Sequence, residues 1–392
     1  MDEETFSELE LKSRRKLAEA KKFAKHRYLF EILSKASGKF YHGIYGIRGV
    51  GKTVLLLQLA ELAKNPLYVP ADAAYLRRYD IYEIVSHAVA KGYSEIYIDE
   101  IHTKSNWKVD LKTLYDEGDA KIFFTGSSSI KIQEGADLSR RAMLYELKPT
   151  SFREYLNIKK GAEIRSVSLE ELENEEKRKE IAYMLSKWSA YLGEYYMYGG
   201  VLYEDIEKEY PKTILSVLEK MLAVDLPAIR KVDAGTIDSL YKLLYKIAIS
   251  GPYEASYSNI ASYLGISKAT AKSLVEDLEK MGLVIGLQPC GGEFRKEPKL
   301  FFTIPFRSAL CKSIGAKPDL GALREEFFVN STNAECYFKT KRGAKTPDFL
   351  LGGKVIEVGG EHRKSASVDY VAVDGLNYQG NAIPLFLFGM LY

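Results

Sequence analysis

The sequence predicts an α/β fold built around a doubly wound parallel sheet. Three features of the chain indicate this fold. β-rich and helical runs alternate between residues 39 and 130. The glycine-rich stretch Gly46–Thr53 separates a β-rich run, 39–45, from an apolar helical run, 54–63. Polar residues close two further β-rich runs, 94–100 and 121–129, and parallel strands bring their carboxyl ends to one edge of a sheet.

Residues 1–38 are expected to form an N-terminal helical segment. Apolar residues recur there at helical spacing, from Phe6 and Leu9 to Ile32 and Leu33. The run Lys12–Lys25 is very basic. We favour a solvated helix face for this run, with a nucleic-acid contact as the alternative.

The stretch Gly46–Thr53 has the spacing G-x-x-x-x-G-K-[ST] of a phosphate-binding loop. Glycines let backbone approach phosphate, and successive N–H groups at a helix N-terminus form an anion nest. Lys52 is expected to reach the β- and γ-phosphates, and the Thr53 hydroxyl to bind Mg²⁺. The cofactors expected are ATP or ADP with Mg²⁺. The candidate nucleotide-binding residues in this stretch are Gly46, Arg48, Gly49, Val50, Gly51, Lys52, Thr53 and Val54.

The runs that follow complete the expected sheet. A strand is expected over 67–71, a helix over 81–91 that Gly92 ends, and a helix over 106–115. The run 96–100 has the form of a Walker B strand, in which Asp99 would hold Mg²⁺ and Glu100 would orient or deprotonate the attacking water. At the end of the next strand, Thr125 and Ser127 could sense the γ-phosphate. The alternative for Asp99 and Glu100 is a pair of exposed acids at a strand end. The alternative for Thr125 and Ser127 is a plain turn.

Four motifs resemble those of a known family. They are Asp99-Glu100-Ile101, Thr125-Gly126-Ser127-Ser128, Leu138-Ser139-Arg140-Arg141 and Pro149–Leu156. The chain resembles AAA+-like, STAND-related ATPases of bacteria and archaea that carry a winged helix and a PD-(D/E)xK nuclease-like C-terminal domain. Arg140 stands where the family has glycine, so we favour Arg141 as the charge-sensing, catalytic arginine, acting in cis or on a neighbouring subunit. The alternative is a surface salt-bridge arginine.

The resemblance implies five segments, with possible assembly into a homo-oligomeric ring such as a hexamer. They are an N-terminal helical segment (1–38), a P-loop ATPase core (39–156), a helical lid or linker (157–235), a winged helix domain (236–305) and a PD-(D/E)xK-like domain (306–392). Gly199-Gly200 matches a glycine pair in the family's lid. We expect the tyrosines before this pair to pack in a core.

Residues 256–281 follow the pattern of a helix-turn-helix. A short helix, 256–264, precedes the turn Gly265-Ile266-Ser267 and a second helix, 268–281, with Ser267 as its N-cap. The β-rich runs 282–289 and 299–304 would supply a wing with Gly291-Gly292 at its tip. Four outward side chains are candidate DNA contacts: Lys268, Thr270, Lys272 and Ser273. Protein docking and a lid role are the alternatives.

The last segment contains a two-residue hairpin signal, Gly352-Gly353. With that turn, Leu351 pairs with Lys354, and Asp348 faces Glu357. Facing carboxylates favour a divalent cation, and the resemblance adds Glu325 as a third possible ligand of this nuclease-like site. The motif lysine is absent, because Gly359 occupies its position. We therefore expect an inactive nuclease-like domain, unless Lys364 folds back.

Composition limits the remaining possibilities. The net charge is only +3, so any basic surface must be local. The cysteines Cys290, Cys311 and Cys336 show no metal spacing and suit a reduced interior. No apolar run has membrane-spanning length and no secretory signal is evident, so we expect a cytoplasmic protein with no membrane partner.

Three functional hypotheses remain. The first is a Mg²⁺-dependent ATPase that binds DNA and remodels or translocates on it, in replication or repair. The second is a nucleotide-controlled switch that docks a protein without DNA motor activity. The third is an ATP-regulated nuclease.

Overall fold

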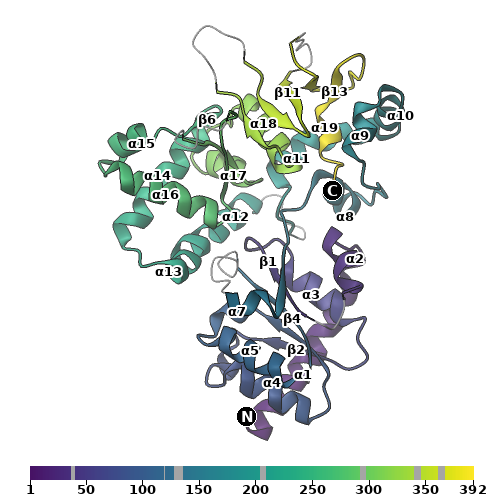
Figure 1. The fold of residues 1–392 in the computed structure, drawn as a ribbon, viewed down its shortest axis with the longest axis vertical. Coiled ribbons are helices and arrows are strands. Elements are labelled where there is room, and N and C mark those ends of the chain that lie inside the picture. Colours follow the sequence, from purple (N-terminus) through teal and green to yellow (C-terminus); the bar gives the residue numbers. More distant parts are fainter. Residues whose placement is uncertain are drawn as a thin grey trace. The chain divides into compact units, whose positions relative to one another are not determined.

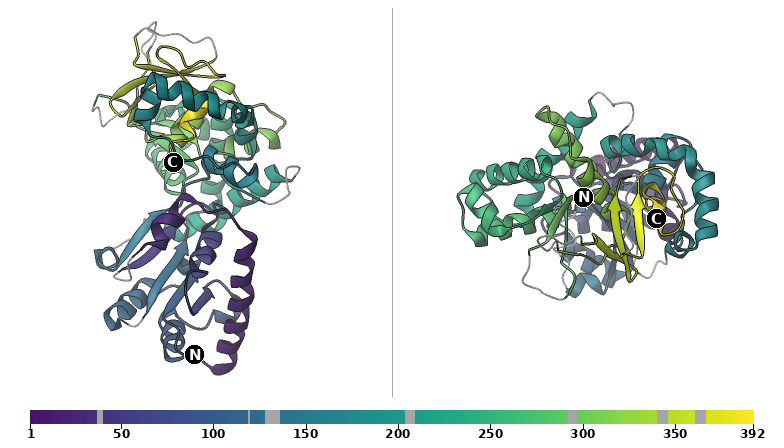
Figure 2. Two further views of the ribbon diagram at one scale, coloured as in Figure 1. Left: turned by 90° about the vertical axis from the view of Figure 1, so that its right-hand side faces the viewer. Right: turned by 90° about the horizontal axis from the view of Figure 1, so that it is seen from above.

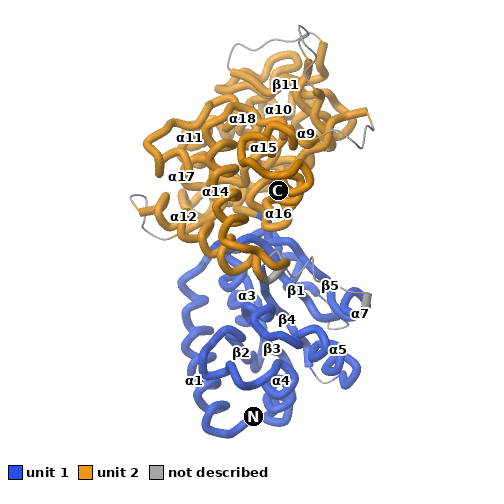
Figure 3. The backbone as a smooth tube through the Cα atoms, turned by 90° about the vertical axis from the view of Figure 1, so that its left-hand side faces the viewer, with its two compact units in different colours: residues 1–148 blue, residues 149–392 orange. Residues whose placement is uncertain are grey.

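The chain folds into two compact units, residues 1–148 and 149–392 (Figure 3). The structure is a computed structural model, and it describes residues 1–36, 40–118, 120–127, 136–203, 209–291, 297–339, 346–360 and 367–392. Within these ranges, no helix has both the length and the apolar character needed to cross a membrane.

Unit 1 is organised around a five-stranded parallel sheet in the order β2-β3-β4-β1-β5 (Figure 1). Its strands are β1 (Tyr41–Tyr45), β2 (Pro66–Pro70), β3 (Glu95–Asp99), β4 (Lys121–Gly126) and β5 (Ala142–Glu146). The three central strands are almost wholly buried, as expected for a parallel sheet covered on both faces. The predicted α/β fold is confirmed, and β1 to β4 lie where the sequence placed them, while β5 was not predicted.

Helices connect the strands of unit 1 and bury its sheet. Asp80 caps α4 with a capping box, and Gly118 ends α5 in the left-handed conformation. The apolar faces of these helices join Ile96, Ile98 and Phe124 of the sheet in one core. The connecting helices are α3 (Lys52–Ala60), η2 (Ala74–Leu76), α4 (Ile81–Ala90), η3 (Ile101–Thr103), α5 (Trp107–Glu117) and α7 (Ala136–Ser139).

The N-terminal segment is helical, as predicted, and belongs to unit 1. It consists of α1 (Glu3–Glu19), η1 (Ala20–Lys22) and α2 (Tyr28–Ser34). Helix α1 runs beside β2, along one side of unit 1 (Figure 2). It buries Phe6 and Leu9 in the core. Two lysines of its basic run form exposed ion pairs along the helix, Lys12 with Glu8 and Lys16 with Glu19.

Unit 2 begins with helices that pack against its C-terminal sheet. Phe152, Tyr155 and Tyr195 share one core with Phe327 and Phe349. Of the tyrosines before the glycine pair, Tyr195 and Tyr196 are core residues as expected, whereas Tyr198 is only partly buried and lies outside this core. The helices are α8 (Phe152–Lys159), α9 (Leu169–Glu173), α10 (Glu175–Leu185), η4 (Ser186–Tyr191), α11 (Leu192–Tyr198), α12 (Tyr210–Lys220), the π-helical η5 (Met221–Asp225) and α13 (Leu226–Ile229).

Gly200 shows why the glycine pair is needed. Its φ is +77°, and an added Cβ atom would lie only 1.9 Å from the Ile304 carbonyl oxygen. A side chain is therefore excluded at this position.

The predicted helix-turn-helix is present as a pair of helices. They are α15 (Tyr257–Leu264) and α16 (Lys268–Lys280), and the Ser267 hydroxyl caps α16 by accepting from Thr270 N–H at 3.0 Å. They follow α14 (Ala234–Ile249) and stand beside a three-stranded antiparallel sheet in the order β6-β8-β7. Its strands are β6 (Tyr253–Glu254), β7 (Val284–Leu287) and β8 (Lys299–Phe302). Of the expected wing tip, Gly292 lies outside the described residues.

The C-terminal sheet has the order β13-β12-β11-β10-β9. The predicted Gly352-Gly353 hairpin is confirmed, since Leu351 pairs with Lys354 and both glycines have positive φ, 58° and 72°. The strands are β9 (Cys336–Tyr337), β10 (Phe349–Leu351), β11 (Lys354–Gly359), β12 (Tyr370–Val373) and β13 (Ala382–Pro384). The helices are α17 (Phe306–Ser313), α18 (Leu320–Ser331) and α19 (Leu385–Phe388).

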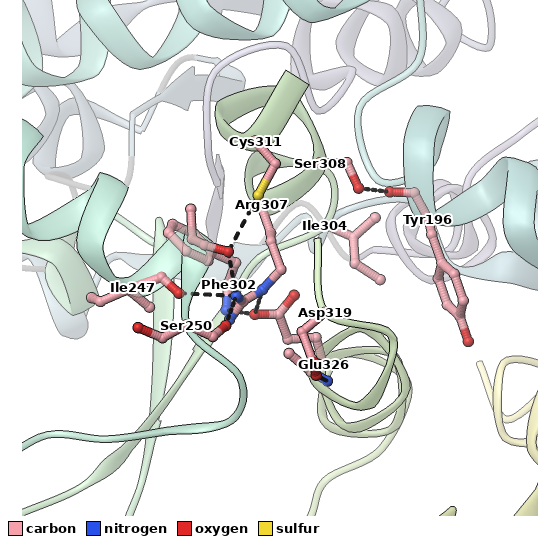
Figure 4. Close-up of polar contacts among 12 residues, drawn as sticks. Tyr196, Ile247, Ser250, Phe302, Ile304, Arg307, Ser308, Cys311, Asp319 and Glu326 are labelled. Carbon is pink, nitrogen blue, oxygen red and sulfur yellow. Dashed lines mark hydrogen bonds and ion pairs between the residues drawn. The ribbon is translucent and has the colours of Figure 1, made fainter. Parts of the chain in front are cut away.

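Arg307 joins the helices of unit 2 at a fully buried junction (Figure 4). Its guanidinium donates to the carbonyls of Ile247, Ala248 and Ser250, at 2.9, 2.7 and 2.7 Å, where α14 ends. Its Nε donates to Glu326 of α18 at 2.8 Å. Each charge therefore has a partner, which a buried ion pair requires.

The expectation of three reduced cysteines is wrong. Cys290 and Cys336 form a disulfide, with Cα atoms 5.1 Å apart, while Cys311 is a buried thiol. Backbone pairing brings the two together, because Cys290 N–H donates to the Tyr337 carbonyl at 2.8 Å and Tyr337 N–H to that of Gln288 at 3.0 Å. The two cysteines are 46 residues apart, so no local pattern could reveal this pairing.

Candidate functional site

The stretch Gly46–Thr53 leaves the carboxyl end of β1 and enters α3, as the motif requires. Gly46, Gly49 and Gly51 have φ of 156°, 78° and 98°. Gly49 and Gly51 thus adopt backbone conformations that favour glycine. Of the other residues predicted to bind nucleotide here, Val50 is buried, while Arg48 and Val54 are partly exposed.

Lys52 is poised inside the loop. Its side chain is 5% exposed, and Nζ donates to the carbonyls of Gly46 at 2.9 Å and Ile47 at 3.0 Å. These carbonyls hold the ammonium beside the loop, whose backbone amides would bind a phosphate.

Asp99 lies at the centre of a cluster of hydroxyl groups. Its carboxylate accepts from Thr53 and from Tyr68, each at 2.8 Å, and from Thr125 on the neighbouring strand. Burial raises the pKa of Tyr68 well above its usual range, and the Asp99 charge raises it further, so Tyr68 is a hydrogen-bond donor here. Three strands and α3 therefore converge on this one carboxylate.

This donor set fits a magnesium ion. Thr53 and Asp99 offer hard oxygen ligands beside the phosphate loop, and Mg²⁺ is usually bound through one or two such groups with substrate phosphates and water. The ion would supply charge to neutralise the phosphates. Thr53 and Asp99 would hold it, either directly or through water.

Glu100 follows Asp99 in an unusual backbone conformation. Of the described residues other than glycine, it is the one with positive φ, at 52°. Its N–H donates to the Thr125 hydroxyl at 3.0 Å, and a carboxylate oxygen lies 3.4 Å from Nδ1 of His102. Such a conformation in a bulky residue persists only where the surroundings fix it, and here it follows directly on the end of β3 at Asp99.

The predicted sensor residues lie at the same edge of the sheet. Thr125 contacts Asp99 and Glu100, and Ser127 N–H approaches Nδ1 of His102 at 3.4 Å. Ser128 is outside the described residues. The phosphate loop, Asp99, Glu100, Thr125 and Ser127 are thus brought together, while their catalytic roles remain predictions.

Arg141 is not part of this site, and the prediction of a cis role is wrong. It precedes β5, and its carbonyl accepts from Tyr41 N–H, which places it at the amino edge of the parallel sheet. The phosphate loop follows the opposite edge of β1. Arg141 instead makes a two-nitrogen pair with Asp116, at 3.0 to 3.1 Å. The sequence alone does not give the position of Arg141 relative to the phosphate loop, because that position depends on the direction of β5 in the sheet.

The candidate DNA contacts lie on α16. Lys268, Thr270 and Lys272 are exposed, and Ser273 is half-buried. Each lysine has a carboxylate nearby: Lys268 lies 3.9 Å from Glu297, and Lys272 lies 3.7 Å from Glu276. The face is therefore of mixed charge.

The three carboxylates of the predicted nuclease-like site do not assemble as expected. Strand pairing ends at Phe349 and Ile356, one residue short of Asp348 facing Glu357. The Asp348 carboxylate accepts from Val358 N–H at 2.7 Å. Glu325 forms a buried ion pair with Lys299 of β8. Across the described ranges, no group of three His, Cys, Asp or Glu side chains is arranged to hold a metal ion. Lys364 lies outside these ranges.

Burial raises the pKa of Glu325 to about 7, with Lys299 opposing and the Asp348 charge adding to the shift. A carboxyl whose pKa is raised on folding stabilises the fold at low pH, and this contribution is lost as pH rises from the unfolded value towards 7. We expect a loss of about 3 kcal/mol between pH 4 and pH 8 from this group. Glu325→Gln should flatten this dependence in urea unfolding series at several pH values. The control Glu335→Gln, at an exposed position, should keep the pH dependence of the free energy of unfolding. An equal pH dependence in the two variants would show that Glu325 is not its source.

Several residues around these sites were missed by the sequence. Arg27, Tyr68 and His102 surround the phosphate loop and its acids, and Lys299 supplies the partner of Glu325. His102, two residues after Glu100, could have been suspected from its position. Arg27, Tyr68 and Lys299 lie in other segments of the chain, and no sequence motif points to them.

Residues 40–156 match the family model of the AAA domain. The match supports an AAA-type ATPase domain that comprises most of unit 1 and ends within α8, which packs in unit 2.

Similar proteins include an uncharacterised protein of Methanocaldococcus jannaschii. It is 29% identical over 92% of this chain and 87% of its own length. Among solved structures, ORC1 of Aeropyrum pernix in complex with DNA is 13% identical, with a TM-score of 0.30, over 77% of this chain and 92% of that one. AMPPCP-bound DnaA of Aquifex aeolicus is 16% identical, with a TM-score of 0.28, over 64% of this chain and 86% of that one.

Proposed function

We propose that the protein is a Mg²⁺-dependent ATPase whose nucleotide cycle acts on DNA. The observation that supports hydrolysis is the arrangement at the carboxyl edge of the unit 1 sheet. Lys52 lies in the loop, the Thr53 hydroxyl and the Asp99 carboxylate are 2.8 Å apart, and Glu100 follows Asp99 with its carboxylate 3.4 Å from Nδ1 of His102. ATP would bind with its phosphates on the loop amides, and Glu100 would orient or deprotonate water.

DNA is proposed as the partner on account of α16. This helix presents Lys268 and Lys272 to solvent in the second position of a helix-turn-helix, and the three-stranded sheet stands beside it as a wing would. The carboxylates near these lysines do not prevent phosphate contact, because exposed ion pairs contribute little free energy. We therefore propose a winged helix that meets the DNA backbone.

DNA-stimulated ATPase activity tests this proposal. At about 100 mM salt, single-stranded, duplex or branched DNA should raise turnover. The double variant Lys268→Ala/Lys272→Ala should weaken the apparent DNA affinity at least about tenfold and lower the salt dependence, because two phosphate contacts are lost.

The matched control is Lys212→Ala/Lys242→Ala, since these exposed lysines on α12 and α14 also pair with nearby carboxylates. If the ATPase rate is the same with and without each form of DNA, then DNA is not the partner.

A protein-docking switch is the second candidate. The mixed charge of α16 and the net charge of +3 favour it, because non-specific DNA binding depends on uncompensated positive charge. In that case nucleotide would control a partner protein, and DNA would leave turnover unchanged.

A nuclease activity is not part of the proposal. Glu325 is paired with Lys299, Asp348 accepts a backbone N–H, and Gly359 stands in the place of the motif lysine. A ring assembly in which Arg141 completes a neighbour's site extends the proposal. It would require the pair with Asp116 to open.

A further inference from the structure

Arg27 contacts the phosphate loop from outside. It lies just before α2, far from the loop in sequence, and its side chain is buried, with 7% exposed. Its Nη1 donates to the Val50 carbonyl at 2.6 Å and its Nη2 to the Lys148 carbonyl at 2.7 Å. One guanidinium therefore bridges the loop and the segment that follows β5.

The surroundings of Arg27 are themselves fixed. Gln58 of α3 donates to the carbonyls of Phe23 and Lys25, at 2.8 and 3.0 Å, and the Tyr28 hydroxyl donates to the Glu146 carbonyl at 2.6 Å. The segment after β5 is also close-packed on the loop, since a Cβ atom on Gly46 would lie 2.5 Å from the Leu147 carbonyl oxygen. The chain around Arg27 and the segment after β5 are therefore each fixed by contacts of their own.

The bond to Val50 has a consequence for the next residue. In a trans peptide the C=O and N–H point in opposite directions. Because Arg27 holds the Val50 carbonyl on its own side, the Gly51 N–H must point away from Arg27, towards the inside of the loop. That amide belongs to the row of N–H groups that a phosphate loop presents to its ligand.

This peptide needs an external constraint. Gly51 has φ of 98°, and rotating the 50–51 peptide by half a turn would bring φ to the negative side, which glycine also populates readily. The rotated peptide would present a carbonyl oxygen to the phosphates in place of an amide.

We propose that Arg27 is a positioning residue for nucleotide binding, which holds the Val50–Gly51 peptide with its N–H towards the phosphates. The inference rests on the proposed nucleotide site and assigns to it a residue outside every motif of the chain. Arg27 acts through the loop backbone, so its effect belongs to ground-state binding of the phosphates and much less to the chemical step.

The test compares Arg27→Met with Tyr28→Phe in the full chain. Affinity for a fluorescent ATP analogue, steady-state KM and kcat, and the thermal midpoint without nucleotide are measured for each. Arg27→Met should raise Kd and KM at least about tenfold, because a charged hydrogen bond is lost, while kcat changes less than about threefold. Tyr28→Phe loses two hydrogen bonds of the same segment, one to the Glu146 carbonyl and one from the Lys148 N–H, and should keep both constants within about twofold.

The two kinetic constants separate positioning from mere stabilisation. If Arg27 only stabilised the fold, Arg27→Met would lower the active fraction, and with it kcat, while Kd and KM stayed unchanged; that result would overturn the inference. An unmodified protein that fails to bind the analogue would overturn the proposed function and the inference with it. Weak binding of the analogue by Arg27→Met, together with tight binding by the unmodified protein, would support both the proposed function and the inference.

Discussion

Lys52→Ala is expected to abolish tight ATP binding and, with it, turnover. The ammonium is already positioned in the loop by the Gly46 and Ile47 carbonyls, so a phosphate has only to exchange these two acceptors for its own oxygens. Charge-assisted bonds of this kind are among the strongest in proteins, and losing them should weaken ATP binding at least about a hundredfold. Titration with a fluorescent ATP analogue and a steady-state ATPase assay measure the loss.

The control for this variant is Lys64→Ala. Lys64 is an exposed lysine shortly after α3, and its removal changes the net charge equally without touching the loop. Affinity in Lys52→Ala within twofold of the unmodified protein would show that the loop does not bind phosphate.

Glu100→Gln should stop hydrolysis while ATP stays bound. The amide has nearly the same shape as the carboxylate but cannot accept the proton of the attacking water, and general-base catalysis contributes about a hundredfold or more. Binding should change less than about threefold, because Lys52, Thr53 and Asp99 are untouched. Single-turnover hydrolysis and nucleotide retention on the protein are the measurements.

Glu95→Gln is the matched control for Glu100→Gln. Glu95 begins β3, at the edge of the sheet opposite to Glu100, so the same substitution there should leave turnover unchanged. Equal hydrolysis rates in Glu100→Gln and the unmodified protein would remove Glu100 from the mechanism.

Local patterns explain which parts of this molecule the sequence could predict. The phosphate loop, the acids after β3, the Ser267 cap and the Gly352-Gly353 turn each depend on residues close together in the chain, and each lies where it was expected. Hydrophobic periodicity located β1 to β4 and the helices between them, but it did not single out β5.

Contacts between distant segments could not be predicted in this way. Arg141 fits a charge-sensing motif, yet the polarity of β5 places it at the wrong edge of the sheet for its own site. Arg27 has no motif, and its role emerges only when α2 packs against α3. The regular pairing of β10 with β11 ends one residue before Asp348 and Glu357, and the Asp348 carboxylate accepts from the Val358 N–H of β11.

The Cys290–Cys336 bond limits where unit 2 can act as a hinge. It ties the segment that follows β7 to β9, the first strand of the C-terminal sheet, while Arg307 links the end of α14 to α18. Both ends of the helix-turn-helix region are thereby anchored to the C-terminal sheet and its helix. Any movement within unit 2 should therefore carry α16 and that sheet together as one rigid body, with bending confined to parts of unit 2 outside this anchored block.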